Sequence, residues 1–105
     1  MSQSSNQKQQ VTYAPPVVPD KYDVIFHNDD VTTMDFVVEV MKKVFYLSSA
    51  DATNLMLEVH LDGEAVVGTY SFDIATSKAT RTMQMAVAEG FPLKVTIQPT
   101  KDLPF

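Results

Sequence analysis

Two polar segments of the chain contain residue types that could bind a ligand or carry out chemistry. The first, His27–Asp30, lies between a strand-like pattern and a helix-like one, and the second is His60, near the end of a later helical pattern. Asn and Asp often bond to their own backbone in turns, and carboxylates favour helix N-termini, so the first segment is also consistent with an ordinary turn. His60 is likewise consistent with a cation at the negative end of a helix.

Neither segment matches a catalytic or metal-binding signature. Two histidines and two aspartates could in principle hold a divalent ion, but the chain has no cysteine and no H-E-x-x-H pattern. Asp29 and Asp30 could serve as an acid–base pair, yet adjacent side chains often diverge in direction. No Ser-His-Asp order, P-loop or dinucleotide fingerprint is present. We therefore expect no enzymatic activity, no metal and no cofactor.

Two helical patterns place methionine and valine beside these polar residues. In one, Met56, Val59 and His60 are related by i+3 and i+4 and so share a helix face. In the other, Met34, Val37 and Met41 recur at similar spacing. Simple core packing between two helices explains this pattern. A second interpretation is an apolar pocket with a polar rim, which suits methionine because its thioether adapts to differently shaped ligands.

Composition narrows the functional classes. The chain has 105 residues, a net charge of −5 and one arginine, so the Lys/Arg cluster that binds nucleic acid is missing. No apolar run approaches the ~18 residues of a membrane span, and the first ten residues have no apolar signal region. We expect a cytoplasmic, monomeric protein that binds neither nucleic acid nor membrane.

Hydrophobic periodicity predicts one domain over residues 21–99, between a flexible tail at 1–20 and a short tail at 100–105. The expected elements are three strands and three helices in the order β-α-α-β-α-β, an α+β two-layer sandwich with helices on one face of an antiparallel sheet. The predicted strands span residues 21–26, 65–70 and 93–98, with a loose segment from Pro99. The predicted helices are one capped by Thr32 and ending near Tyr46, one from Ser48 to Gly63 and one from Ser71 to Gly90. Gly68 within the second strand indicates a bulge or a close approach of the backbone.

Four motifs, in this order and spacing, resemble the ClpS adaptor family over residues 21–98. They are N-D-D-x-T-x-M-D-F-V at 28–37, L-M-L-x-V-H at 55–60, G-x-Y-S-x-D-I-A-x-S-K at 68–78 and F-P-L at 91–93. The resemblance implies a fold similar to the C-terminal domain of the ribosomal stalk protein. It also implies binding of N-degrons, proteins that begin with a large hydrophobic residue such as Leu, Phe, Tyr or Trp, and their delivery to a ClpA- or ClpC-type AAA+ unfoldase.

The resemblance also implies roles for individual residues. Asn28, Asp29 and His60 would hold the substrate's α-amino group, whose three N–H donors require acceptors only. The side-chain pocket would be lined by Thr32, Met34, Val37, Val40, Met56, Val59 and Leu93, with Val40 at its floor and Met34 at its mouth. Asp73 and Lys78 would contact the N-terminal domain of the unfoldase, although ordinary solvated helix charges explain them equally simply. Residues 1–19 would form the arm that the unfoldase engages.

Some residues depart from the family pattern. Thr33 replaces a usual proline, Val31 a common aromatic residue, and Asp73 a usual glutamate. These changes affect the loop and the unfoldase contact but leave the amine-binding residues intact. An alternative interpretation is a domain that docks on a Clp ATPase or the ribosome and has no N-degron pocket. Such a domain would need neither the N-D-D motif nor His60.

Overall fold

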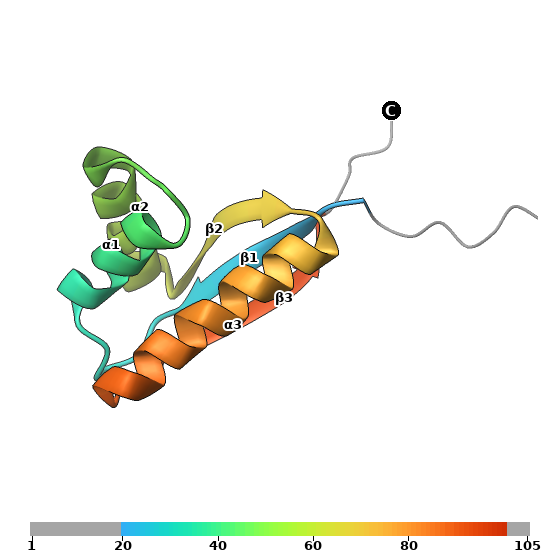
Figure 1. Ribbon diagram of the computed structural model, residues 1–105. Helices are drawn as coiled ribbons and strands as arrows, with labels where there is room; N and C mark the ends of the chain where they lie inside the picture. Colours follow the sequence, from blue (N-terminus) through green and yellow to red (C-terminus); the bar gives the residue numbers. More distant parts are fainter. Residues whose placement is uncertain (1–19, 101–105) are drawn as a thin grey trace, which may run out of the picture.

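Three antiparallel strands and three helices make up the part of the chain that the structure describes, residues 20–100 of a computed structural model (Figure 1). The predicted order β-α-α-β-α-β and the α+β class are confirmed. The elements are β1 (Tyr22–His27), α1 (Met34–Lys43), α2 (Ser49–Asp62), β2 (Glu64–Tyr70), α3 (Phe72–Glu89) and β3 (Lys94–Pro99). The tail predicted at 1–20, apart from Asp20, and residues 101–105 lie outside the described residues.

The sheet has the order β2-β1-β3, so the first strand of the chain is the central one. Its residues Val24, Ile25 and Phe26 are all buried, as expected for a strand paired on both sides. Val24 pairs with Gly68 while Ile25 pairs with Val66, so β2 has one extra residue at this point. This irregularity confirms the bulge predicted from Gly68.

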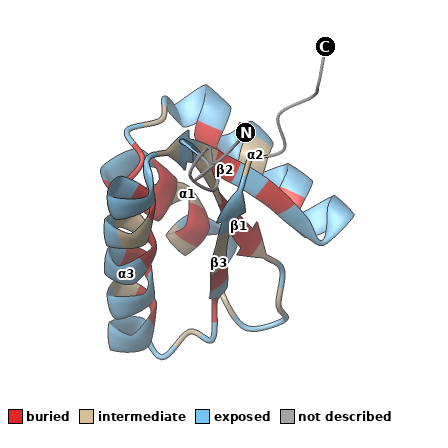
Figure 2. Ribbon diagram, turned by 90° about the vertical axis from the view of Figure 1, so that its right-hand side faces the viewer, coloured by how far each residue is buried: buried red, intermediate tan, exposed pale blue. Residues whose placement is uncertain are grey.

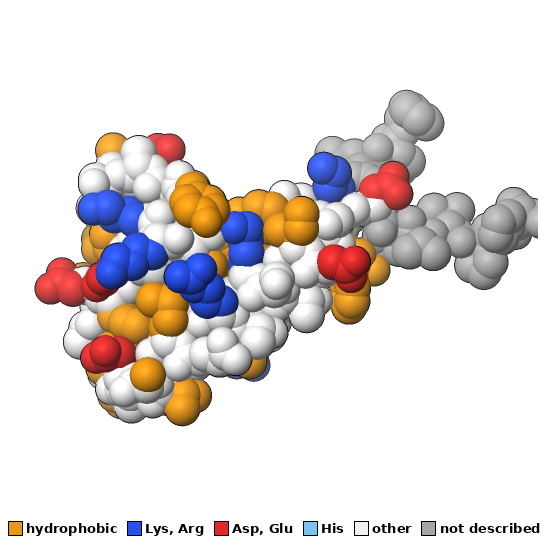
Figure 3. Space-filling model, viewed as in Figure 1, with side chains coloured by type: hydrophobic (Ala, Val, Ile, Leu, Met, Phe, Trp, Pro, Cys, Tyr) orange, Lys and Arg blue, Asp and Glu red, His pale blue; other side chains and the backbone are white. Residues whose placement is uncertain are grey.

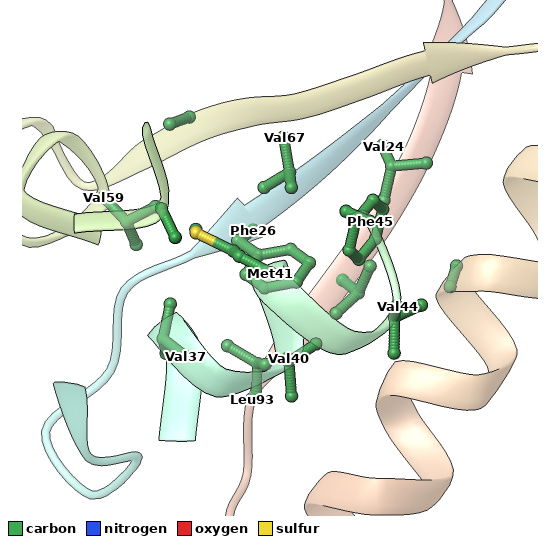
Figure 4. Close-up of a cluster of buried hydrophobic side chains, with 14 of the residues drawn as sticks. Val24, Phe26, Val37, Val40, Met41, Val44, Phe45, Val59, Val67 and Leu93 are labelled. Carbon is green, nitrogen blue, oxygen red and sulfur yellow. The ribbon is translucent and has the colours of Figure 1, made fainter. Parts of the chain in front are cut away.

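The helices cover the sheet face that carries Val24 and Phe26. In Figure 1, α3 runs along the sheet, while α1 and α2 stack at one end of it. Figure 2 shows that buried residues lie on the sides of the helices that face the strands. The centre of this core contains Phe26, Met41 and Val40, all fully buried (Figure 4). At 25–30 cal/mol per Å² of apolar surface, this burial is the main term that stabilises the domain.

The first helix differs from its prediction at both ends. Thr33, and not Thr32, caps α1, because its hydroxyl oxygen accepts the backbone N–H of Phe36 at 3.2 Å. The helix ends at Lys43, three residues before the predicted end near Tyr46. Tyr46 adopts a left-handed conformation (φ 57°), which a right-handed helix cannot continue through. Both differences move the boundaries of the loops that flank α1.

The remaining helix ends follow the sequence closely. Ser48 caps α2 by accepting the backbone N–H of Asp51 at 3.1 Å. Gly63 ends this helix in a left-handed conformation (φ 91°), and Gly90 ends α3 in the same way. Ser71 occupies the N-cap position of α3 without a side-chain bond to the helix.

The last strand continues beyond its predicted end. Pro99 pairs with Tyr22 at the edge of the sheet. Thr100 then donates its backbone N–H to the Lys21 carbonyl at 3.0 Å and its hydroxyl to Asp23 at 2.8 Å. Proline fits at this position because an edge strand does not require every N–H to be paired.

Gly68 provides a test of close packing within β2. A Cβ atom at this position would lie 2.6 Å from ring carbons of Tyr70, well inside van der Waals contact. We expect Gly68→Ala to lower the free energy of unfolding by about 1–3 kcal/mol, the usual cost of an added group in a packed region. Chemical denaturation would measure this change. In a Tyr70→Ala background the same substitution should cost clearly less, and an equal cost would show that the two residues do not compete for this space.

Candidate functional site

The candidate site lies where β1 ends and α2 ends. The backbone N–H of Asn28 donates to the Gly63 carbonyl at 2.8 Å, one step beyond the paired residues His27 and Glu64. Because Gly63 directly follows α2, this bond holds the helix's last turn, which carries His60, next to the start of the loop at 28–33. Residues more than 30 positions apart in the sequence therefore meet at one place.

Asp29 organises the loop. Its Oδ1 accepts the backbone N–H groups of Val31 at 2.8 Å and Thr32 at 2.7 Å, and its Oδ2 accepts the Thr32 hydroxyl at 2.8 Å. The turn interpretation of this segment is therefore correct. It is compatible with a second role, because a carboxylate has about four acceptor positions and these bonds fill three.

These bonds also set the charge of Asp29. Partial burial raises the pKa of its carboxyl group, but the hydrogen bonds from Thr32 and Val31 outweigh that effect, so the pKa lies below its ordinary value of 3.8. The carboxylate is consequently ionised at neutral pH. Its negative charge suits a cationic ligand.

The side chains of Asn28 and His60 are exposed at the surface, whereas Asp29 is half-buried. His27, which directly precedes Asn28, makes contacts elsewhere: its Nδ1 lies 3.3 Å from Glu64 Oε1 and its Nε2 lies 2.8 Å from the Thr96 hydroxyl. Since side chains alternate along a strand, these contacts lie on the sheet face opposite Phe26.

The predicted pocket residues divide into two groups. Val37, Val40, Val59 and Leu93 are buried members of the core, and Val40 is 0% exposed (Figure 4). Met34 is 44% exposed at the first position of α1, while Met56 and Thr32 are half-buried. The core-packing interpretation therefore holds for the first group. The residues of the second group are partly exposed.

Asp73 and Lys78 lie together at a different place. They line a hollow of about 430 Å³ beside α3, along with Val44, Tyr46, Ile74, Ser77 and Arg81. On the face shown in Figure 3, several Lys and Arg side chains gather near α1 and α3, with hydrophobic side chains between them. Lys78 is half-buried and donates its ammonium to the Val44 carbonyl at 2.6 Å, so it is not an ordinary solvated charge.

No sequence pattern pointed to the other residues of this hollow. Ile74 is apolar yet 50% exposed, and it lies one turn before Lys78 on α3. Tyr46 is 78% exposed and comes from the α1–α2 connector, 32 positions earlier in the chain than Lys78. Periodicity along a single helix cannot reveal a partner from so distant a segment.

Residues 20–100 contain no group of three or more His, Cys, Asp or Glu residues arranged to hold a metal ion. Across that same range, none of the helices is long and apolar enough to cross a membrane. The fold and the candidate site together define a small α+β domain in which a polar loop and the end of a helix are joined at the surface.

Comparison with known proteins identifies the family. The family described as ATP-dependent Clp protease adaptor protein ClpS matches residues 18–96. An ATP-dependent Clp protease adapter protein ClpS from Acetivibrio thermocellus is 51% identical over 81 residues, which are 77% of this chain and 82% of that protein. The corresponding protein of Neisseria gonorrhoeae is 45% identical over 80 residues, which are 76% of this chain and 77% of that protein. The chain belongs to the ClpS family of Clp protease adaptors.

A solved structure agrees with this assignment. Agrobacterium tumefaciens ClpS2, determined bound to L-phenylalaninamide, superposes with a TM-score of 0.75 at 37% sequence identity. The match covers 79% of this chain and all of that one.

The depressed pKa of Asp29 leads to a prediction about acid stability. A carboxyl group whose pKa is lower in the folded state stabilises that state above its unfolded pKa, and this contribution is lost as the pH falls through the folded pKa. We expect Asp29→Asn to lower the melting temperature by roughly 2–5 °C at pH 7, because the neutral amide oxygen still accepts hydrogen bonds but accepts them less strongly than a carboxylate, a loss of about 0.5 kcal/mol. Thermal unfolding followed by circular dichroism from pH 7 to pH 2 should show this difference shrinking below pH 4.

Asp30→Asn is the matched control, because Asp30 is the exposed next residue of the same loop. It should change the melting temperature little at any pH. If the melting temperatures of the parent and of Asp29→Asn fall in parallel as the pH is lowered, the role assigned to the Asp29 carboxylate is wrong.

Proposed function

We propose that this chain binds proteins that begin with a free, large hydrophobic residue (Leu, Phe, Tyr or Trp) and delivers them to a ClpA- or ClpC-type AAA+ unfoldase. The observation that carries the proposal is the solved relative bound to L-phenylalaninamide. That ligand combines a free α-amino group with a large apolar side chain. The candidate site in this chain has hydrogen-bond acceptors for the amino group and apolar residues for the side chain.

In this proposal Asn28, Asp29 and His60 hold the α-amino group. An α-ammonium is mostly charged at neutral pH and donates three hydrogen bonds. Asp29 has acceptor capacity left beyond its loop bonds, Asn28 has a side-chain carbonyl, and neutral His60 has a ring nitrogen that can accept directly or through water. Hydrogen bonds to charged groups contribute about 1.5–3 kcal/mol each, so the loss of the charge on the amine should be costly.

The first side chain of the substrate would enter between α1 and α2. Val37, Val59 and Leu93 would form the walls and Val40 the floor, since these residues already make one apolar cluster. Thr32, Met34 and Met56 lie nearer the surface, and the flexible methionines can change rotamer to admit an aromatic ring. Burying a large apolar side chain contributes about 1.5–3 kcal/mol. Met34 at the mouth would exclude β-branched first residues by steric contact.

Delivery would use the hollow beside α3. Asp73 and Lys78 supply opposite charges next to the exposed apolar residues Tyr46 and Ile74, a composition typical of a protein-docking surface. We propose that the unfoldase's N-terminal domain binds here, while residues 1–19 form the arm that the unfoldase engages. The adaptor would act as a cytoplasmic monomer without a cofactor.

A peptide-binding assay tests substrate recognition. We expect a labelled peptide that begins with Phe or Leu to bind, and its N-acetylated form to bind about a hundredfold or more weakly, because acetylation removes the charge and two donors. Fluorescence anisotropy across a panel that varies only the first residue would also show weaker binding for Val and Ile. Equal binding of free and acetylated peptides would rule out amine recognition and favour a pure docking domain.

Single substitutions assign the amine-binding residues in the same assay. His60→Ala and Asn28→Ala should weaken binding about tenfold each without changing the fold, as measured by circular dichroism. Glu58→Ala is the matched control, since Glu58 is an exposed residue of the same helix two positions away. If His60→Ala binds like the Glu58→Ala control, His60 has no part in the site.

Delivery has its own test. We expect Asp73→Ala to keep the peptide affinity of the parent but to bind the unfoldase's N-terminal domain about three- to tenfold more weakly, the range for a single interface charge. Calorimetry with that isolated domain would measure the change. A variant that loses peptide binding as well would place Asp73 in the substrate site and not at a separate docking surface.

A further inference from the structure

Lys78 connects two parts of the molecule that the proposed function treats separately. It lies on α3, in the hollow that also contains Asp73. Its ammonium nevertheless points at the end of α1, where it donates to the Val44 carbonyl at 2.6 Å. Val44 is the C-cap residue of α1, and carbonyls at this end of a helix lack intrahelical partners. The cation therefore satisfies such a carbonyl and lies at the negative end of the helix dipole.

Aromatic rings surround the same ammonium. The Nζ atom lies 4.7 Å from the ring centroid of Tyr46, 5.3 Å from that of Tyr70 and 5.7 Å from that of Phe45. All three distances fall within the range of cation–π attraction. Phe45 continues into the core, where its ring packs edge-on against Phe26 at 5.5 Å. A single cation thus contacts the connector between α1 and α2, strand β2 and the edge of the core.

A short connector joins α1 to α2. It runs from Val44 to Ser48 and contains the left-handed Tyr46. The Leu47 N–H closes it by donating to the Met41 carbonyl at 3.1 Å. The proposed pocket takes its walls from both helices, so its width depends on this connector.

We propose that Lys78 is a positioning residue for the substrate pocket: by bonding to Val44 and attracting the surrounding rings, it fixes the α1–α2 connector and thereby the spacing of the two helices that form the pocket. This inference rests on the proposed function. It assigns Lys78 a role in substrate affinity that is present without any unfoldase. Lys78 would also contribute to docking, so its loss would affect both sites.

The test measures peptide affinity in the absence of an unfoldase. Lys78→Met keeps most of the aliphatic stem and removes the ammonium, and we expect it to bind a Phe-initiated peptide roughly 3- to 10-fold more weakly, because a less preorganised pocket must be ordered on binding. Lys78→Arg, which retains a cationic donor, should restore affinity to within about twofold of the parent. Each variant is measured well below its unfolding temperature.

Arg81→Met is the matched control. Arg81 lies almost one turn further along α3 and lines the same hollow, so this variant loses the same unit of charge from the same surface. It should bind the peptide like the parent. If Lys78→Met binds like Arg81→Met, or if Lys78→Arg is as weak as Lys78→Met, the proposal is wrong. If Lys78→Met fails to fold, Lys78→Gln takes its place in the comparison, because it removes the charge and keeps a neutral hydrogen-bond donor.

Amide hydrogen exchange separates this inference from the proposed function. The Leu47 amide should exchange faster in Lys78→Met but not in Arg81→Met, while the amides of β1 keep their protection. Unchanged Leu47 exchange would show that Lys78 does not fix the connector. Faster exchange with unchanged peptide affinity would show that the connector does not set the pocket. A parent protein that fails to bind the peptide would refute the proposed function, while Leu47 exchange would still report on the Lys78 contact.

Discussion

The register between β1 and β2 is the constraint on which the candidate site depends. The two strands pair up to His27 and Glu64, and the next bond joins the Asn28 N–H to the Gly63 carbonyl. Because Gly63 alone separates α2 from β2, strand pairing also fixes where α2 ends. A shift of one residue would turn the side chains of β2 to the opposite face and move His60 away from Asp29. The left-handed conformation of Gly63 makes this tight connection possible without steric strain.

The same residues serve the core and the proposed pocket. Val37, Val40 and Val59 are nearly or fully buried, so large-to-small substitutions at these positions would remove packing as well as any ligand contact. The surface part of the site is different. Asn28 and His60 are exposed and contribute little to packing, which makes them the positions where binding can be altered independently of folding. This division explains how a domain with few residues can build a binding site without a large separate cavity.

Local sequence patterns predicted the elements, their order and the class of the fold, because most strands and helices have a clear period and the strand at 65–70 is rich in apolar, β-branched residues. They did not distinguish Thr32 from Thr33 as the cap of α1. Both residues can cap, and the choice depends on Asp29, whose carboxylate accepts the Thr32 hydroxyl and leaves Thr33 for the helix. They also missed the bond between Lys78 and Val44. Its partners are 34 positions apart, and their meeting depends on how α3 packs against the end of α1.

In the proposed docking surface, Lys78 would have two roles at once. An ammonium has three N–H donors, and the Val44 carbonyl uses one of them. The remaining donors can reach a partner's carboxylate across the hollow, since Lys78 is half-buried and not enclosed. A bound protein that took the N–H group now bonded to Val44 would leave the Val44 carbonyl without a cationic donor. The connector between α1 and α2 would then be held less firmly. Docking and substrate affinity would then be linked through the Nζ atom of Lys78. Whether docking raises or lowers substrate affinity would depend on which of its N–H groups the docked protein binds. Asp73 is more exposed and has no such internal contact among the described residues, so its substitution would report on the proposed docking alone.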